Sequence, residues 1–100
     1  LSKSKEIFEE IIISENKFYS ILALNIILEK ELEKDENKVL NFFSITEKVA
    51  STKTEKDLLL FKKALYLIKI TRIKEGRLIL NKMIEDGSEL KMLAEDVLNN

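Results

Sequence analysis

Apolar residues recur along the chain at the three- and four-residue spacing of amphipathic helices. In the first segment, Ile7, Phe8 and Ile11 fall on one helical face. The alternation expected of a strand is absent, so every regular segment is predicted to be helical. Six helices are predicted, over residues 4–13, 17–33, 38–50, 55–71, 74–85 and 89–98.

Short polar stretches between these segments supply the expected helix ends. Asn16 is placed to cap the second helix, and Thr54 with Asp57 resembles a capping box for the fourth. Gly87 predicts the end of the fifth helix, and Ser88 is placed to cap the sixth. Short connections favour antiparallel neighbours. We therefore expect an all-α fold of three antiparallel hairpins, forming one domain over residues 1–100.

Small residues recur at positions that would face each other across a hairpin. Ala64 and Gly76 lie twelve positions apart, on the fourth and fifth predicted helices. Small side chains would let these helices approach closely, with larger apolar residues filling the volume beside them. A similar frame can be laid on the second and third helices from Ala23, and a half-length copy of it begins at Leu90. The residues assigned to this packing are Ala23, Leu60, Ala64, Leu67, Gly76, Leu80 and Ala94.

This arrangement resembles an irregular tetratricopeptide repeat, although Lys63 and Met83 depart from the usual residue types and Ser88 replaces the closing proline. The run FKKALYLIKITRIKEGRLILNKMIEDGSELKMLAEDVL is similar to the C-terminal part of the tetratricopeptide-like domain in the bacterial ancillary Sec-translocon subunit family. FYSILALNIILEKEL is similar to the preceding hairpin. The resemblance implies a right-handed helical array that binds proteins, with translocon components or periplasmic chaperones as partners.

The resemblance also implies a location. In that family a single N-terminal membrane helix anchors the soluble domain in the inner membrane, facing the periplasm. The chain begins at Leu1 rather than Met, so we expect a fragment whose membrane anchor is missing. The apolar runs within the sequence fall well short of the ~20 residues that span a bilayer. A cytoplasmic location remains the alternative.

Composition narrows the chemistry that the chain can perform. His and Cys are both absent, which excludes imidazole catalysis, thiol nucleophiles, disulfides and the common zinc sites. The net charge of −1 gives no electrostatic case for nucleic-acid binding, for which a basic face would be expected. We therefore expect no enzymatic activity, metal or cofactor. The acidic residues are interpreted as a solvated face: Glu9, Glu10, Glu29, Glu31 and Glu33.

Two groups of residues are candidates for partner binding. Tyr66 lies among Lys62, Lys69 and Arg72, a set that could line a groove for a peptide carrying carboxylates. The alternative is a solvated stripe with an amphipathic tyrosine across it. Asn25 interrupts an apolar stretch and could bind a partner's backbone amide. It could equally face water or bond a neighbouring helix end.

Three classes of function remain open at this stage. The first is a non-enzymatic protein–protein interaction module. The second is a structural oligomerisation domain that uses apolar faces of the end helices, including the isoleucine-rich first helix, to form a homo-oligomer. The third, an enzyme that uses only carboxylates and lysines, would need a deep pocket with two perturbed carboxylates. The interaction module is the hypothesis that the repeat resemblance favours.

Overall fold

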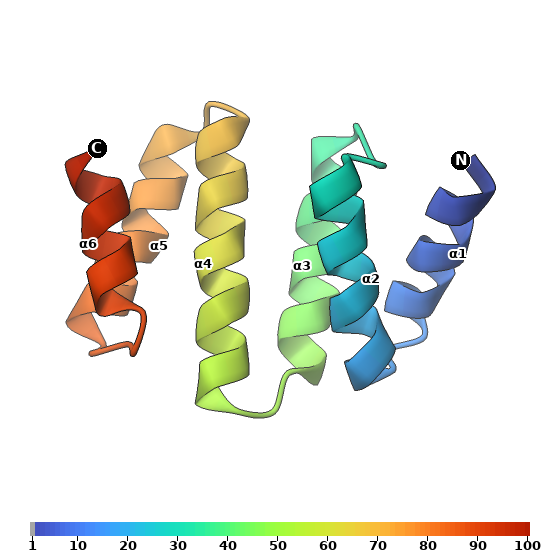
Figure 1. Ribbon diagram of the computed structural model, residues 1–100, viewed down its shortest axis with the longest axis horizontal. Coiled ribbons are helices and arrows are strands. Elements are labelled where there is room, and N and C mark those ends of the chain that lie inside the picture. The colour runs from blue at the N-terminus through green and yellow to red at the C-terminus, as the bar shows by residue number, and fades with distance from the viewer. Residues whose placement is uncertain (1) are drawn as a thin grey trace. The chain divides into compact units, whose positions relative to one another are not determined.

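The structure is a computed structural model that describes residues 2–100, with side chains described from residue 3 onward. The described residues form six helices and no strand, which confirms the all-α prediction (Figure 1). The helices are α1 (Ser2–Ile13), α2 (Lys17–Lys30), α3 (Glu36–Val49), α4 (Lys53–Lys69), α5 (Ile73–Glu85) and α6 (Lys91–Asn99).

The helices group into two compact units, Leu1–Ser51 and Thr52–Asn100. The first unit holds α1, α2 and α3, and each of these helices contacts the other two (blue to green in Figure 1). The second holds α4, α5 and α6, in which α5 contacts both α4 and α6 (yellow to red). The single domain over residues 1–100 stays a prediction.

The end of α2 differs from its prediction. The helix stops at Lys30 instead of continuing to residue 33, because Glu31 takes a left-handed conformation with φ of 51°. The N–H of Leu32 then donates to the carbonyl of Ile27, 3.0 Å away, which closes the helix. The next helix begins two residues earlier than predicted, because Asp35 caps its first N–H groups.

The capping box of α4 lies two residues before the predicted one. Thr52 Oγ1 accepts from the N–H of Glu55 at 3.1 Å, and the Glu55 carboxylate accepts from the N–H of Thr52 at 3.2 Å. The prediction of a Thr54–Asp57 box was therefore wrong. Thr52 and Glu55 have the usual Thr-x-x-Glu pattern, which satisfies two backbone donors reciprocally. The carboxylate of Asp57 takes no part in this capping box.

Gly87 ends α5 as predicted, but Ser88 does not cap α6. Gly87 has φ of 69°, and the N–H of Ser88 donates to the carbonyl of Met83 at 3.0 Å. The last helix begins at Lys91, three residues after Ser88. The buried Ser88 hydroxyl donates instead to Asp57 Oδ2 at 2.9 Å. The same hydroxyl oxygen accepts from the N–H of Leu90 at 3.1 Å, so Ser88 closes the turn before α6 and makes a tertiary hydrogen bond at the same time.

The α4–α5 turn places a β-branched residue in a strained conformation. Thr71 has φ of 68°, and the turn closes by a 2.8 Å hydrogen bond from the N–H of Arg72 to the carbonyl of Leu67. Left-handed backbone costs an L-residue about 1–2 kcal/mol that glycine avoids. We expect Thr71→Gly to raise the free energy of unfolding by about 0.5–1 kcal/mol, after the higher entropy of the unfolded glycine chain is deducted.

Urea denaturation followed by circular dichroism tests this expectation. Glu31→Gly, at the equivalent left-handed position after α2, is the matched comparison and should also stabilise. A loss of stability in Thr71→Gly alone would mean that contacts of the threonine side chain outweigh its backbone strain.

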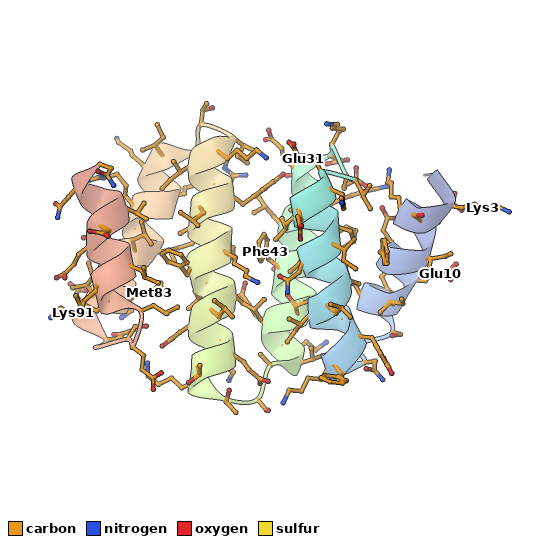
Figure 2. The ribbon with its side chains drawn as sticks, in the orientation of Figure 1. Lys3, Glu10, Glu31, Phe43, Met83 and Lys91 are labelled. Atoms are coloured by element: carbon orange, nitrogen blue, oxygen red, sulfur yellow. The ribbon has the colours of Figure 1, made fainter. Side chains whose placement is uncertain are left out.

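The core of the first unit contains buried polar side chains that find partners within it. Ser20 Oγ donates to the carbonyl of Ile11 at 3.1 Å, and Thr46 Oγ1 donates to the carbonyl of Phe42 at 3.0 Å. These bonds keep the hydroxyls satisfied among apolar neighbours. Side chains such as Lys3 extend outward from the same unit (Figure 2). The buried apolar residues of the unit are Ile12, Ala23, Leu24, Ile27, Val39, Phe42, Phe43 and Ala50.

The second unit packs around a close approach of α4 and α5. A Cβ added at Gly76 would lie 2.7 Å from the carbonyl oxygen of Ala64 and 2.7 Å from Cγ1 of Ile68. Only glycine fits at that distance, because no side-chain atom can approach a backbone oxygen so closely. The centre of the unit is a cluster of Ala64, Leu80, Met83 and Ala94.

Candidate partner-binding site

The cationic stripe predicted around Tyr66 spans a helix end. Lys62 and Tyr66 are half-buried on α4, and Lys69 is exposed at its last residue. Arg72 lies outside α4 and directly precedes the first residue of α5. Burial lowers the pKa of Lys62. All four side chains make interactions of their own, and partner binding through them stays a prediction.

Arg72 is held by a residue in the first turn of α5. Its guanidinium donates two hydrogen bonds to the carboxylate of Glu75, with Nη2 lying 2.6 Å from Oε1. These bonds lower the pKa of Glu75 below its usual value. The positive charge of Arg72 is thus directed toward the first turn of α5.

Asn25 lies in the first unit, on α2, and is half-buried. Asn25 also makes an interaction within the protein, which is compatible with the alternative that it bonds a neighbouring helix end. No contact of its amide defines a binding site, and the proposed contact with a partner backbone stays a prediction.

The residues assigned to repeat packing lie in the interior. Leu60 is half-buried, and the other six are buried. Gly76 lies against the backbone of Ala64, as the close approach of their helices requires. The buried members are Ala23, Ala64, Leu67, Gly76, Leu80 and Ala94.

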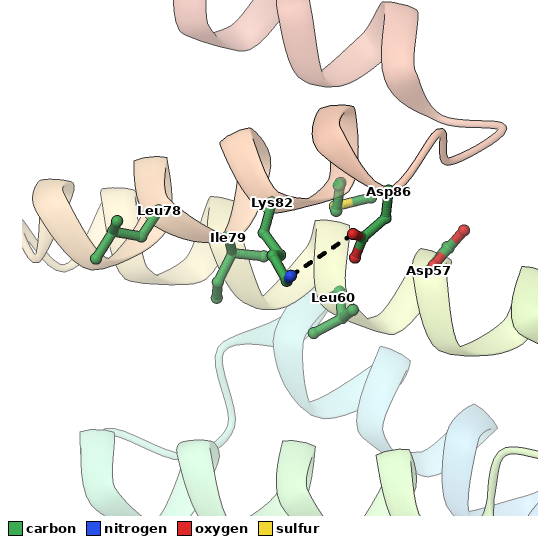
Figure 3. A pocket seen from close by; sticks show the side chains of 7 residues that line it. Asp57, Leu60, Leu78, Ile79, Lys82 and Asp86 are labelled. Atoms are coloured by element: carbon green, nitrogen blue, oxygen red, sulfur yellow. Dashed lines mark ion pairs between the residues drawn. The ribbon is translucent and has the colours of Figure 1, made fainter.

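A pocket of about 220 Å³ opens in the second unit, where α4 and α5 meet. Its lining is mainly apolar, and three charged side chains stand around it (Figure 3). Lys82 and Asp86 come from α5, and Asp57 comes from α4. The apolar lining residues are Leu60, Leu78, Ile79 and Met83.

Asp57 is a buried carboxylate with one oxygen in use. Its residue is only 9% exposed, and Oδ2 accepts from Lys53 Nζ and from Ser88 Oγ, each at 2.9 Å. Burial alone would raise the pKa of Asp57, but these two donors outweigh burial and the pKa is lowered. Asp57 therefore carries a full negative charge at neutral pH. Both hydrogen bonds use Oδ2, so Oδ1 is not engaged in the described structure.

Asp86 and Lys82 form a loose pair at the mouth of the pocket. Lys82 Nζ lies 3.6 Å from Asp86 Oδ1, and both side chains are more than half exposed. Ion pairs with this exposure contribute little to stability, because water and salt screen them. A charged group entering the pocket could therefore displace Lys82 from Asp86 at small cost.

The sequence did not identify this pocket. Asp57 was assigned to a capping box, and Lys82 and Asp86 were not singled out. One signal was present: Asp57 directly precedes three leucines on α4, where a buried charge needs hydrogen-bonding partners. Lys53 on the same helix is one partner, and the second is tertiary. That partner, Ser88, lies 31 residues later and was assigned to a cap.

A second cluster of charges lies in the first unit and corrects the interpretation of Glu33 as solvated. The Glu33 side chain is 4% exposed; Oε2 accepts from the N–H of Asp35 at 2.8 Å, and Lys5 Nζ lies 3.1 Å from Oε1. Oε2 of Glu9 is buried without a hydrogen bond in the described part of the chain, and Oε1 of Glu33 is held by its ion pair with Lys5. The pKa of Glu9 is raised by burial and by Glu33.

The pKa values of the two carboxyl groups in this cluster shift in opposite directions. Burial would raise the pKa of Glu33, but the N–H of Asp35 and the ammonium of Lys5 lower it well below its usual range. Lys38 Nζ adds a more distant positive charge, 4.0 Å from Oε1. Among residues 2–100 no group of three or more acidic, His or Cys side chains is arranged to hold a metal ion.

Comparison with known proteins gave no match to a family model, a curated protein or a solved structure. The α4–α5 pocket is therefore interpreted from its geometry alone. Across the described residues, no helix combines the length and the apolar character needed to cross a membrane.

Proposed function

We propose that the chain is a non-enzymatic protein–protein interaction module, arranged as a tetratricopeptide-like right-handed array of antiparallel hairpins. The close approach of Gly76 to Ala64 supports this proposal, because small residues at a helix crossing are what the repeat pattern requires. Helical arrays of this kind offer partners a broad surface instead of a deep catalytic cleft.

The observation that carries the proposal is the apolar pocket between α4 and α5. Leu78 on its border is 68% exposed, and Ile79 and Met83 continue the apolar surface inward. A large apolar side chain left in water beside a concave apolar lining is typical of surfaces that bind proteins. Met92 and Leu93 on α6 are also exposed and extend the apolar character of this unit.

The location follows from the resemblance to the ancillary Sec-translocon subunits. We place the domain in the bacterial periplasm, anchored to the inner membrane by a segment of the full-length protein, with translocon components or periplasmic chaperones as partners. Protease added to spheroplasts that make the full-length protein tests this placement. Cleavage of the domain is expected, and protection until the cells are lysed would contradict it in favour of the cytoplasm.

Selection from a random dodecapeptide display library against the intact 100-residue chain tests the binding function. We expect peptides with a shared pattern to be enriched and to lose at least tenfold in affinity when Leu78→Glu places a charge beside the pocket. Phe18→Glu is the matched control, because Phe18 is 81% exposed and lies in the other unit.

Two results would contradict a binding site on the second unit. Selection could enrich no common pattern, or Phe18→Glu could abolish binding while Leu78→Glu leaves it unchanged. Circular dichroism of each variant shows that the helices are retained.

The alternative function, a structural oligomerisation domain, is favoured by exposed apolar residues on the first unit. Ile7 and Ile13 are exposed on α1, and Phe18, Tyr19 and Leu22 are exposed on α2. The Phe18 and Tyr19 rings lie 5.8 Å apart, centre to centre. Light scattering separates the two functions: a monomer across a range of concentrations supports the interaction module, and a concentration-independent dimer supports oligomerisation.

A further inference from the structure

The α4–α5 pocket has the size of one side chain. Sites for small molecules usually enclose roughly 300–1,000 Å³, and this pocket encloses about 220 Å³. The occupant that fits is therefore a single anchoring residue of a larger partner. Leu78 on its border would contact the neighbouring part of that partner.

The charges around the pocket select the chemistry of the anchor. Asp57 is ionised and buried, and its Oδ1 is not engaged. Asp86 has only the loose contact with Lys82, at 3.6 Å. Lys53 and Lys82 each pair with one of these aspartates, so the site offers a partner acceptor oxygens and not a net negative charge. A partner carboxylate could not use these acceptors, and a purely apolar side chain would leave them unused. A cationic group on an apolar stem matches both the lining and the charges.

We propose that this pocket binds an arginine side chain of a partner peptide, with its stem against Ile79 and Met83 and its guanidinium donating to Asp57 and Asp86. The inference rests on the proposed interaction function and names the residue that the partner supplies. Arginine fits better than lysine, because its planar group presents several donors at once and gives up hydration more readily. Lys82 turns away from Asp86 into solvent when the guanidinium enters.

The preference for arginine comes from the carboxylates of the pocket and not from the charge of the second unit as a whole. Lys and Arg outnumber Asp and Glu in residues 52–100, so long-range attraction does not draw basic peptides to this unit. Enrichment of arginine in a selected peptide would therefore report the local carboxylates.

A double-mutant cycle on a selected peptide tests the proposal. The fluorescein-labelled peptide is compared with a version in which citrulline, the neutral isostere, replaces arginine, and each is titrated against the intact chain and Asp86→Asn. Charge-assisted hydrogen bonds of this kind are worth about tenfold in affinity each. We expect each change to cost about tenfold alone and the two together to cost little more, because both remove the same contact.

Two further variants complete the design. Asp57→Asn keeps an acceptor for Ser88 and should also weaken the arginine peptide, with circular dichroism and urea denaturation confirming the fold. Asp96→Asn removes an exposed carboxylate on α6 outside the pocket and should leave affinity unchanged.

The outcomes separate this inference from the proposed function. Selected peptides that lack arginine, or that bind equally well with citrulline, would overturn the arginine anchor while leaving the interaction module intact. An equal loss in Asp96→Asn would also overturn it, because a general electrostatic effect would then explain the data. A selection that enriches no peptide would remove the proposed function itself.

Discussion

Gly76→Ala is expected to lower the free energy of unfolding by about 1–2 kcal/mol, although alanine is the better helix former. The added Cβ would lie 2.7 Å from the Ala64 carbonyl oxygen, a backbone atom that cannot rotate away. Overpacking costs about 1–3 kcal/mol, and contact with an immobile backbone atom places Gly76→Ala in the upper part of that range. The gain in helix propensity of about 1 kcal/mol therefore offsets only part of the cost. Gly76→Val adds two methyl groups at the same contact and should lower stability further.

Urea denaturation followed by circular dichroism measures this effect. Asn81→Ala, at an exposed position of the same helix, is the control and should change stability by less than about 0.5 kcal/mol. If Gly76→Ala proved as stable as the natural chain or more so, α4 and α5 would not pack as closely as described. Amide hydrogen exchange of α4 and α5 would locate the destabilisation in the second unit.

Glu33→Ala is expected to lower the free energy of unfolding by about 2–3 kcal/mol. The substitution leaves the N–H of Asp35 without its acceptor and removes the carboxylate that pairs with Lys5. Loss of a buried charged acceptor costs more than loss of an exposed ion pair, because the partly buried N–H of Asp35 loses its charged acceptor. Glu29→Ala on the exposed surface of α2 is the matched control and should have little effect. An equal effect of both variants would contradict the buried position of Glu33.

Glu9→Gln is expected to have the opposite effect at neutral pH and to raise the free energy of unfolding by about 1 kcal/mol. The pKa of Glu9 is raised above its usual 4.5. The favourable contribution of Glu9 to the free energy of unfolding is therefore complete below pH 4.5. It is lost as the pH rises through the pKa of Glu9 in the folded state. Above that value two carboxylates face each other, and a glutamine amide would supply a permanent donor to Glu33.

The free energy of unfolding, measured as a function of pH, tests the opposite pKa shifts of Glu9 and Glu33. In the natural chain, the Glu9 contribution declines as the pH rises above 4.5, whereas the Glu33 and Asp57 contributions decline as the pH falls, because their pKa values are lowered. Glu9→Gln should remove only the first of these slopes. A Glu9→Gln profile that retains the decline above pH 4.5 would show that ionisation of Glu9 does not cause it.

The six helices could be predicted because their periodicity is a local property of the sequence. The errors fall at helix ends, and they have physical causes. Glu31 and Thr71 take left-handed conformations that residue type alone assigns to glycine, so these ends carried no clear signal. Asn16 and Gly87 were predicted correctly, because an N-cap acceptor and a glycine stop act within a few residues of their positions.

The pocket and the carboxyl cluster could not be predicted, because each depends on residues far apart in sequence. Ser88 looked like a helix cap, and only the fold brings it to Asp57. Glu33 looked like part of a solvated acidic face, until the fold brought Lys5 and Glu9 to it. A residue with a strong local role and an equally possible tertiary role cannot be assigned from one sequence.

Chemical-shift mapping of the ¹⁵N-labelled chain with a saturating selected peptide is the most direct measure of where a partner binds. We predict that the perturbed amides cluster on α4 and α5 around Asp57, Ile79 and Asp86, and that Asp86→Asn weakens the effect. Perturbations confined to α1, α2 and α3 would contradict the account, because they would place partner binding on the first unit.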